Sequence, residues 1–434
     1  MTSVLTHPVF IMFVVMLLLM FLGMEIFASM GVASVVYLLI SGQAPLTLLP
    51  NNMINGISNF ALLAIPFFML VGDLMNISGM TARLVDFAKF FVGSCRGGLA
   101  YISVIVTTVT ACVSGSAPAT CSAVSAVMLP ATKKEDYPMD FSAAVICSSS
   151  VLGAIIPPSV TMVFIALITN LSVGRLFFGG LVPGFLMSAV LLLVCKFQIR
   201  KYDFKVYPTG KKTLRGFFTV LKSSILALMA PFIILYGVFS GLATITEVSI
   251  LACTYVLFVG MFVYRSIGIK DVFAAFFKTS VFSSTIMANF SVARMFAWFI
   301  AVEGLGRIIG ESVIAWNLPV WAFMLFINVL FIVTGFFMDA IPIMVIFVPV
   351  LMPVVNTLGI DPIYFCVVVV INLMIGLLTP PVGGLLFLQS MLADVPFNKL
   401  VAQVTPFVIA LFCVLFLVTY VPQLILFVPN LLFG

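Results

Sequence analysis

Long apolar stretches, separated by short polar segments, follow one another along the whole chain. Most are close to the ~20 residues that a helix needs to cross a bilayer. Their apolar residues are continuous, whereas a membrane β-strand alternates apolar and polar residues. The pattern therefore predicts an all-α polytopic membrane protein, with apolar stretches at about 8–24, 26–42, 59–77, 97–130, 141–170, 176–195, 223–240, 248–264, 279–302, 316–354, 363–392 and 400–428.

Composition supports this interpretation. Of the 434 residues, 63% are hydrophobic and 8% are charged, whereas a soluble domain carries roughly 25% charged residues. So few charges exclude a soluble fold, because they cannot cover its surface. The net charge of +6 lies mainly in the polar segments, where it indicates membrane orientation rather than binding to nucleic acid. We therefore expect the lipid bilayer as a partner, and no nucleic acid.

Four of the apolar stretches contain a break near their middle. Two of these stretches are too long for one ordinary crossing and are interrupted by glycine with a hydroxyl residue, which predicts a re-entrant hairpin in each. The other two are interrupted by a proline pair, which predicts interrupted helices because proline lacks the backbone donor that a helix interior uses. In chain order the breaks are Ser114-Gly115-Ser116, Pro157-Pro158, Thr334-Gly335 and Pro380-Pro381.

The breaks recur in the same order in two halves of the chain, on either side of a basic segment at 196–222. The glycine breaks are about 221 residues apart and the proline pairs are 223 apart. A third marker, Asn59-Phe60, is matched by Asn289-Phe290, 230 residues later. Paired interrupted segments at corresponding positions of two halves point to a transporter binding site. We predict two repeats of about five transmembrane helices each, with one re-entrant hairpin per repeat.

The number of crossings and the charges together predict the orientation. If 97–130 enters and leaves the membrane on one side, the first half has an odd number of crossings, so the second half is inverted. The positive-inside rule places the basic segment in the cytoplasm. Both termini then lie outside, and 17 of the 20 Lys and Arg residues lie inside. If 97–130 crossed the membrane completely, the Lys and Arg residues would no longer gather so clearly on one side. The charges therefore favour the hairpin.

The glycine and proline breaks are the places where the chain could bind ions or solute. Backbone that leaves the helix at membrane depth needs polar partners. Hydroxyls and freed carbonyls suit a small monovalent cation, whereas the N-termini of half-helices attract an anion. For Ser114-Gly115-Ser116 the alternative is close helix packing. A lone membrane proline is usually only a kink, but two proline pairs that each follow a broken stretch favour a function.

Two charged residues lie within the predicted membrane segments. Asp339 stands at the middle of the second broken stretch, and an ionisable residue at membrane depth is by default a functional candidate. It could bind a cation, orient the hairpin by accepting backbone amides, or only cap a half-helix. Arg294 could face a substrate carboxylate or extend toward the interface.

The same residues disfavour an enzyme. Ser114 or Ser116 as a nucleophile would need a base, but the single histidine, His7, precedes the first apolar stretch and no lysine lies at membrane depth. An aspartate pair is excluded because Asp339 has no second aspartate at that depth. Phosphate-binding glycine loops are absent, so an ion gradient is the expected energy source. A channel would need a continuous polar lining, whereas the chain offers local breaks.

Six motifs resemble the large membrane subunit, DctM type, of the tripartite ATP-independent periplasmic (TRAP) transporters. The likeness runs over nearly the whole chain in the family's order. The motifs are SGSAPA (114–119), IIPPS (155–159), LFFGGLVPG (176–184), FMDAIPIMVIFVPVLMPV (337–354), LGIDPIYF (358–365) and NLMIGLLTPPVGG (372–384). Pro118 and Thr120 depart from the pattern, because many members carry an acidic residue shortly after the first motif.

The resemblance implies an elevator-type fold with a scaffold and a transport domain. Five parts are expected: scaffold helices with an amphipathic arm (1–96), the first hairpin with its interrupted and following helices (97–195), a basic cytoplasmic linker (196–222), further scaffold helices with an arm (223–315), and the second hairpin with its interrupted and last helices (316–434). The arms are predicted at 81–92 and 303–311, whose charge spacing suits helices on the membrane surface. A plain linker is the alternative for each arm.

The resemblance also implies sodium sites where each hairpin meets an interrupted helix. The first site would comprise Ser114, Gly115, Ser116, Pro157 and Pro158. The second would comprise Gly335, Asp339, Thr379, Pro380 and Val382. The residues expected to bind substrate are Ser116, Ala117, Ser159, Arg294, Asp339 and Gly383.

The function that the resemblance implies is sodium-driven import of an organic acid (carboxylate) across the bacterial inner membrane. A periplasmic substrate-binding protein would deliver the solute. A small four-helix membrane subunit is expected as a separate chain, because this chain lacks the extra helices of fused versions. Sodium is the coupling ion, and no organic cofactor is expected. The alternative is a stand-alone sodium-coupled carboxylate carrier without a binding protein.

Overall fold

The computed structural model describes residues 7–42, 45–92, 95–202, 204, 214–241, 243–304, 319–336 and 338–433, and within these ranges the ordered elements are all helical. They are α2 (Pro8–Phe21), α3 (Ile26–Ser41), α4 (Leu48–Ile57), η1 (Phe60–Leu63), α5 (Ala64–Ile77), α6 (Met80–Val92), α7 (Gly98–Ser114), α8 (Ala117–Lys134), α9 (Met139–Ser150), η2 (Val151–Ala154), α10 (Val160–Thr169), α11 (Val173–Ile199), α12 (Leu214–Ser240), α13 (Ile245–Phe258), η3 (Val259–Val263), α14 (Ile269–Val302), α16 (Val320–Gly335), α17 (Ala340–Thr357), α18 (Pro362–Gly376), α19 (Gly384–Ala393), α20 (Phe397–Tyr420) and α21 (Gln423–Phe433).

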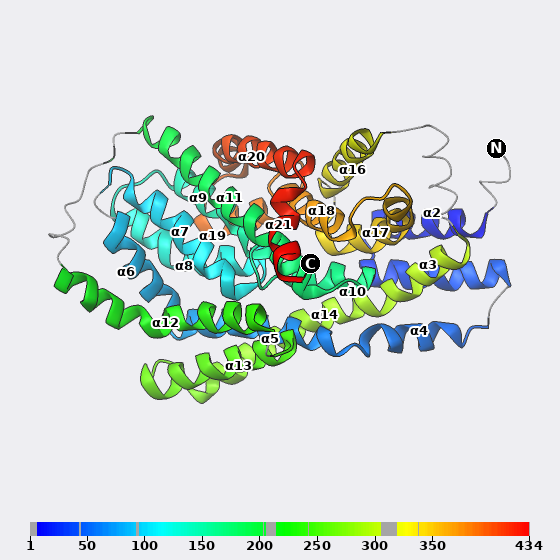
Figure 1. The fold of residues 1–434 in the computed structure, drawn as a ribbon, viewed down its shortest axis with the longest axis horizontal. Coiled ribbons are helices and arrows are strands. Elements are labelled where there is room, and N and C mark those ends of the chain that lie inside the picture. Colours follow the sequence, from blue (N-terminus) through cyan, green and yellow to red (C-terminus); the bar gives the residue numbers. More distant parts are fainter. Residues whose placement is uncertain are drawn as a thin grey trace.

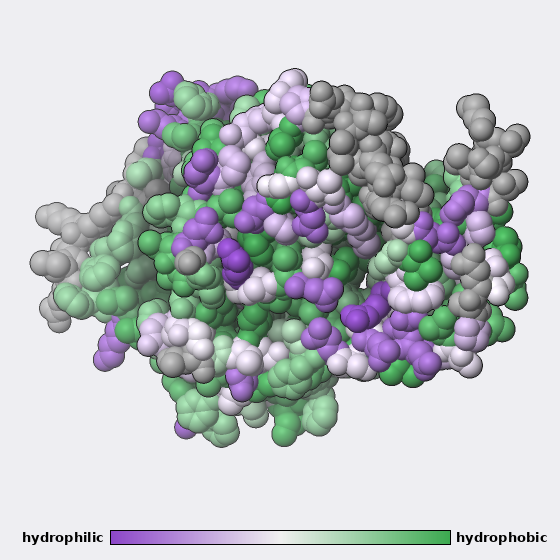
Figure 2. All heavy atoms as spheres, turned by 45° about the vertical axis from the view of Figure 1, so that its right-hand side comes forward, coloured by the Kyte–Doolittle hydropathy of each residue, from purple (hydrophilic) through white to green (hydrophobic). Residues whose placement is uncertain are grey.

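Membrane-spanning length is reached by only some of these helices. In the described ranges, six are long and apolar enough to cross a membrane: Phe60–Ile77, Val173–Ile199, Gly216–Ser240, Ile245–Val263, Ala340–Thr357 and Phe397–Tyr420. Many of the others are apolar but shorter, and several of these are the two parts of a broken stretch. Figure 2 shows hydrophobic residues in broad areas at the left, the bottom and the right of one face, with hydrophilic residues across its middle.

The helices form two groups (Figure 1). In the outer group, α2–α6 and α12–α14, α4 and α3 pack along α14 while α5 packs against α13. In the inner group, α7–α11 and α16–α21, α18 contacts α10, α11, α16, α17 and α20. The groups meet where α14 contacts α17, where α5 contacts α7 and α8, and where α6 and α12 contact α7.

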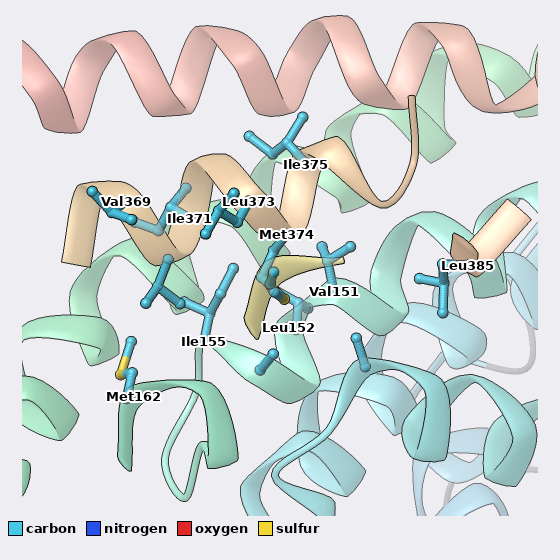
Figure 3. Packing of buried hydrophobic residues seen from close by; sticks show 14 of the residues in the cluster. Val151, Leu152, Ile155, Met162, Val369, Ile371, Leu373, Met374, Ile375 and Leu385 are labelled. Atoms are coloured by element: carbon cyan, nitrogen blue, oxygen red, sulfur yellow. The ribbon is translucent and has the colours of Figure 1, made fainter. Parts of the chain in front are cut away.

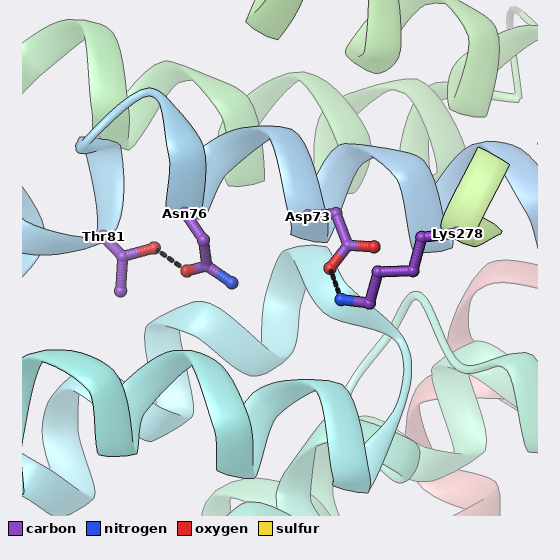
Figure 4. Close-up of polar contacts among 4 residues, drawn as sticks. All are labelled: Asp73, Asn76, Thr81 and Lys278. Atoms are coloured by element: carbon purple, nitrogen blue, oxygen red, sulfur yellow. Dashed lines mark hydrogen bonds and ion pairs between the residues drawn. The ribbon is translucent and has the colours of Figure 1, made fainter. Parts of the chain in front are cut away.

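Polar contacts reinforce the outer group (Figure 4). The Lys278 ammonium on α14 donates to Asp73 Oδ1 on α5 at 2.8 Å. At the end of α5, the Thr81 hydroxyl donates to Asn76 Oδ1 at 2.7 Å and ties the start of α6 to α5. Because the Lys278 side chain is 72% exposed, its ion pair contributes only about 0–1 kcal/mol.

The core of the inner group lies around α18. Every residue of this helix from Ile363 to Gly376 is buried. Figure 3 shows Ile371, Leu373 and Met374 of α18 beside Leu152 and Ile155, which come from the broken region of the first half. Helices in lipid gain little from the hydrophobic effect and associate by close packing and hydrogen bonds. The packing of α18 against the first break therefore holds the two halves together.

The chain leaves the helix at all four predicted breaks. In the first half, α7 ends at Ser114 and α8 begins at Ala117, with Gly115 at φ +65° in the left-handed region that favours glycine. The proline pair at 157–158 separates η2 from α10. In the second half, α16 ends at Gly335, and 377–383 separates α18 from α19. Both proline pairs contain a cis peptide bond.

Three features differ from the pattern of apolar stretches. The stretch 400–428 is not one helix: it divides into α20 and α21, because Pro422 disfavours helical geometry at Val421, which has φ −124° and ψ 75°. Helix α4 occupies a segment that has no apolar stretch of its own. The first repeat marker also differs locally, since the Asn59 side chain caps η1 whereas Asn289 lies inside α14.

The arm predicted at 81–92 is helical and corresponds to α6. Its expected partner at 303–311 lies largely outside the described residues, as do residues 203 and 205–213 of the basic segment 196–222.

Candidate functional site

The first candidate site lies where the segment between α7 and α8 (tip 1, residues 114–116) meets the segment between η2 and α10 (break 1, residues 155–159). The Val160 N–H donates to the Gly115 carbonyl at 2.9 Å. A methyl group placed on Gly115 would lie 3.1 Å from the Pro158 carbonyl oxygen. The two segments therefore touch through backbone, and an ordinary side chain at position 115 would push them apart.

Hydroxyl oxygens surround this contact. The Ser114 hydroxyl bonds with the Thr120 hydroxyl, and a methyl group on Gly153 would lie 2.9 Å from the Ser116 carbonyl oxygen. The Ser159 hydroxyl donates to the Ala154 carbonyl at 2.5 Å and accepts from Met162 N at 3.1 Å, so it caps α10. Neutral oxygens at the C-terminal end of α7 provide the kind of surroundings that a monovalent cation binds.

Thr120 is a member of this site that the sequence did not assign. It is fully buried, it bonds with Ser114, and it lies directly against Gly153. The sequence showed only that position 120 departs from the acidic residue of many TRAP members. The contact with Gly153 depends on the packing of α8 against η2, which no local pattern reveals.

The second candidate site has the same plan. The segment between α16 and α17 (tip 2, of which Phe336, Met338 and Asp339 are described) meets the segment between α18 and α19 (break 2, residues 377–383). The Val382 N–H donates to the Phe336 carbonyl at 3.3 Å. At the preceding residue, Gly335, a methyl group on Gly376 would lie 3.1 Å from the Gly335 Cα. The tip and the break are again in backbone contact.

Asp339 stands at the N-terminus of α17, beside break 2. A methyl group on Gly384 would lie 3.5 Å from Asp339 Oδ1, and Asp339 accepts no capping hydrogen bond from α17. It lines a cavity of about 210 Å³ together with Gly335, Gly383 and the α2–α3 residues Met20 and Ile26. Site 2 is thus more open than site 1, where Ser114, Gly115, Pro157 and Pro158 are buried.

Arg294 lies in a different cavity, of about 240 Å³, between the outer and the inner group. The lining residues come from α4 (Asn52), α14 (Phe290, Ala293, Arg294, Ala297, Trp298), the C-terminal end of α10 (Leu167, Ile168, Asn170) and α17 (Val345, Pro349). α10 begins at break 1 and α17 begins at tip 2. At 1.5 Å rise per residue, this cavity is roughly 8–15 Å along a helix from each site.

The structure therefore brings the predicted residues together in three places. Ser114, Gly115, Ser116, Ala117, Pro157, Pro158 and Ser159 gather around tip 1. Gly335, Asp339, Thr379, Pro380, Val382 and Gly383 gather around tip 2. Arg294 stands apart from both, with Asn52, Asn170 and Trp298 as neighbours that the sequence did not assign.

A buried polar pair lies beneath each site. In the first half the Ser149 hydroxyl donates to Thr107 Oγ1 at 3.1 Å. In the second half the Asn372 amide donates to Asn328 Oδ1 at 2.9 Å and to its carbonyl at 3.0 Å. Asn328 follows Thr107 by 221 residues and Asn372 follows Ser149 by 223, the offsets found for the breaks. The two pairs thus occupy corresponding positions.

The comparisons with known proteins decide the family. Residues 13–424 match the family described as "Tripartite ATP-independent periplasmic transporter, DctM component". The chain belongs to the DctM family. It is therefore a TRAP large permease subunit, a multi-pass membrane protein of a transporter that depends on a substrate-binding protein.

Relatives of this DctM chain match over nearly their full length. The C4-dicarboxylate TRAP transporter large permease of Rhodobacter capsulatus is 33% identical over 97% of this chain and 99% of its own. The sialic acid TRAP transporter large permease SiaM of Vibrio cholerae is 33% identical over 96% of this chain and 97% of its own. The sequence resemblance to the TRAP family is confirmed.

A solved structure shares the fold. The YdaH transporter of Alcanivorax borkumensis, whose crystal structure is described as having an unusual topology, superposes with a TM-score of 0.63 over 96% of this chain and 98% of its own. At 15% sequence identity the likeness concerns the fold alone.

Proposed function

We propose that this DctM chain imports an organic acid, delivered by a periplasmic substrate-binding protein, and that a sodium gradient drives the import by an elevator movement. The inner group is the transport domain and the outer group is the scaffold. The chain works in the bacterial inner membrane, with both termini in the periplasm and with a separate four-helix membrane subunit.

The observation that carries this proposal is the matching contact of each tip with a break. The Gly115 carbonyl accepts from Val160 at tip 1, and the Phe336 carbonyl accepts from Val382 at tip 2. The half-helices after the breaks pack reciprocally: α10 on α17 of the second half, and α19 on α8 of the first. Two inverted repeats that interlock around two ion sites would produce this pattern.

Sodium suits both sites for reasons of ligand chemistry. Tip 1 offers the hydroxyls of Ser114 and Thr120 with nearby backbone carbonyls, and tip 2 adds the carboxylate of Asp339. The substrate carboxylate is assigned to Arg294, because this guanidinium lines a cavity and forms no ion pair with any residue that the structure describes. Helices α10 and α17 connect this cavity to the two sodium sites.

Reconstituted transport tests the function. The chain and its small membrane subunit are reconstituted in proteoliposomes and the binding protein is added. Uptake of the acid that the binding protein carries is then measured. We expect uptake to require the binding protein and to be lost in Arg294→Gln, while Arg265→Gln, on the loop before α14, retains it. Equal uptake without the binding protein would support a stand-alone carrier instead.

A further inference from the structure

The cavity around Arg294 has a composition that distinguishes classes of carboxylate. Among its described lining residues Arg294 carries the one charge, and the others are apolar apart from Asn52, Asn170 and Trp298. A dicarboxylate held in such a cavity would leave its second carboxylate without a cation. A charge that loses water without gaining a partner is unfavourable.

The end of α10 makes a second carboxylate less favourable still. α10 ends at Thr169 with Asn170 as its C-cap, and Leu167, Ile168 and Asn170 line the cavity, so the C-terminal end of this helix lies at the cavity. A helix C-terminus carries a partial negative charge of about half an elementary charge. It repels an anion and attracts hydrogen-bond donors such as hydroxyl groups.

The remaining polar side chains suit hydroxyl groups. The Asn52 amide nitrogen donates to the Leu48 carbonyl at 3.1 Å, which leaves its side-chain oxygen to accept from a ligand. Asn170 is exposed and forms no side-chain hydrogen bond within the described structure. Both carboxamides offer an acceptor, and Asn170 also offers donors.

Trp298 adds an aromatic surface to the lining of the same cavity. The indole is only partly buried, and it follows Arg294 by one helical turn on the same face of α14. The carbon-bound hydrogens of a polyhydroxylated chain or ring pack against such an aromatic surface, while its hydroxyls bond to neighbouring polar groups.

From these observations we propose that the cavity selects a polyhydroxylated monocarboxylate, that is, a sugar acid, over a dicarboxylate. Arg294 binds the carboxylate, Asn52 and Asn170 bind hydroxyls, and Trp298 packs against the carbon skeleton. The inference rests on the proposed function, since it assigns the substrate class of the same site. The names of the two relatives reported above, which cite a C4-dicarboxylate and sialic acid, do not decide between the classes.

Ligand binding to the full chain in lipid nanodiscs tests the inference, with gluconate and succinate as the two probes and isothermal calorimetry as the readout. We expect gluconate to bind at least about tenfold more tightly than succinate, a difference that one or two good polar contacts produce. Trp298→Leu should weaken gluconate binding about tenfold while changing succinate binding less. The matched control is Trp321→Leu, an exposed tryptophan at the start of α16 that lines none of the cavities described above.

The outcomes separate the two proposals. Succinate binding that equals or exceeds gluconate binding and is lost in Arg294→Gln would overturn the selectivity and leave the transport function standing. Binding of neither probe, or binding of both that is unaffected by Arg294→Gln, would overturn the selectivity together with the assignment of Arg294 to the substrate.

Discussion

At the scale of single residues, glycine determines how closely the tips approach their neighbours. Gly335 and Gly376 face each other between α16 and α18, but a methyl group would meet different surroundings at each. On Gly376 it would lie 3.1 Å from Gly335 Cα and 3.3 Å from the Gly335 carbonyl oxygen, whereas on Gly335 it would lie 3.4 Å from Gly376 Cα. The first is a tight contact with backbone, which would have to shift by a few tenths of an ångström, and the second is an ordinary contact.

We therefore predict that Gly376→Ala lowers the free energy of unfolding by about 1–3 kcal/mol, the usual cost of overpacking, and that Gly335→Ala lowers it by less. The thermal unfolding midpoint of the purified protein in one detergent measures both. Equal midpoints for the two variants would show that the geometry of this contact is wrong.

The sequence predicted single residues well where the signal was local. Gly115 and the proline pairs marked the breaks, because a positive φ and a missing backbone donor are properties of those residues themselves. Thr120, Asn52, Asn170 and Trp298 were not assigned to a site, because their roles depend on which helices pack together. Thr120 lies against Gly153 on η2, and Trp298 lines a cavity that α10 and α17 complete.

At the scale of elements, the proposed elevator movement requires α7 to move along α5. The two helices touch at Gly72, where an added Cβ would lie 3.3 Å from Ser114 Cβ. This separation is close to the roughly 3.5–4.5 Å between Cβ atoms in a disulfide. A cross-link here would join the proposed scaffold to tip 1.

We predict that Gly72→Cys/Ser114→Cys, in a variant without the native cysteines, forms a disulfide that stops uptake and that a reductant restores it. Each oxidised sample is compared with the same protein after reduction, since Ser114 also belongs to a proposed sodium site. The control is Gly56→Cys/Ser291→Cys, which joins α4 to α14 within the outer group, where an added Cβ on Gly56 would lie 3.2 Å from Ser291 Cα. Full uptake by the oxidised Gly72–Ser114 pair would argue against movement at this contact.

The helices themselves were largely predictable from apolar length and from breaks, and the errors have a physical origin. The end of α20 at Tyr420 was missed because the apolar stretch continues through Pro422, and apolar length alone does not register that this proline disfavours helical geometry at Val421. The residues of α4 were not predicted as a helix, because this short element carries several polar residues and packs along α14.

At the scale of the whole molecule, the two halves interlock through reciprocal contacts. Break 1 lies against α18, as Figure 3 shows, and the Cys121 and Ser125 side chains of α8 donate to Gln389 Oε1 on α19 at 3.0 and 2.8 Å. These contacts join α8, which begins after tip 1, to α19, which begins after break 2. If both tips bind sodium, we expect sodium at either site to affect the same elevator movement.

The measurement that tests the central claim most directly is the sodium dependence of uptake by the reconstituted complex. With potassium replacing sodium and every other gradient held constant, we predict that uptake falls to the level of empty liposomes. Asp339→Asn should raise the sodium concentration at half-maximal uptake about tenfold, as expected when one charge-assisted ligand is lost. Asp86→Asn, the same change on α6 and away from both tips, should leave it unchanged. Undiminished uptake without sodium would contradict the account.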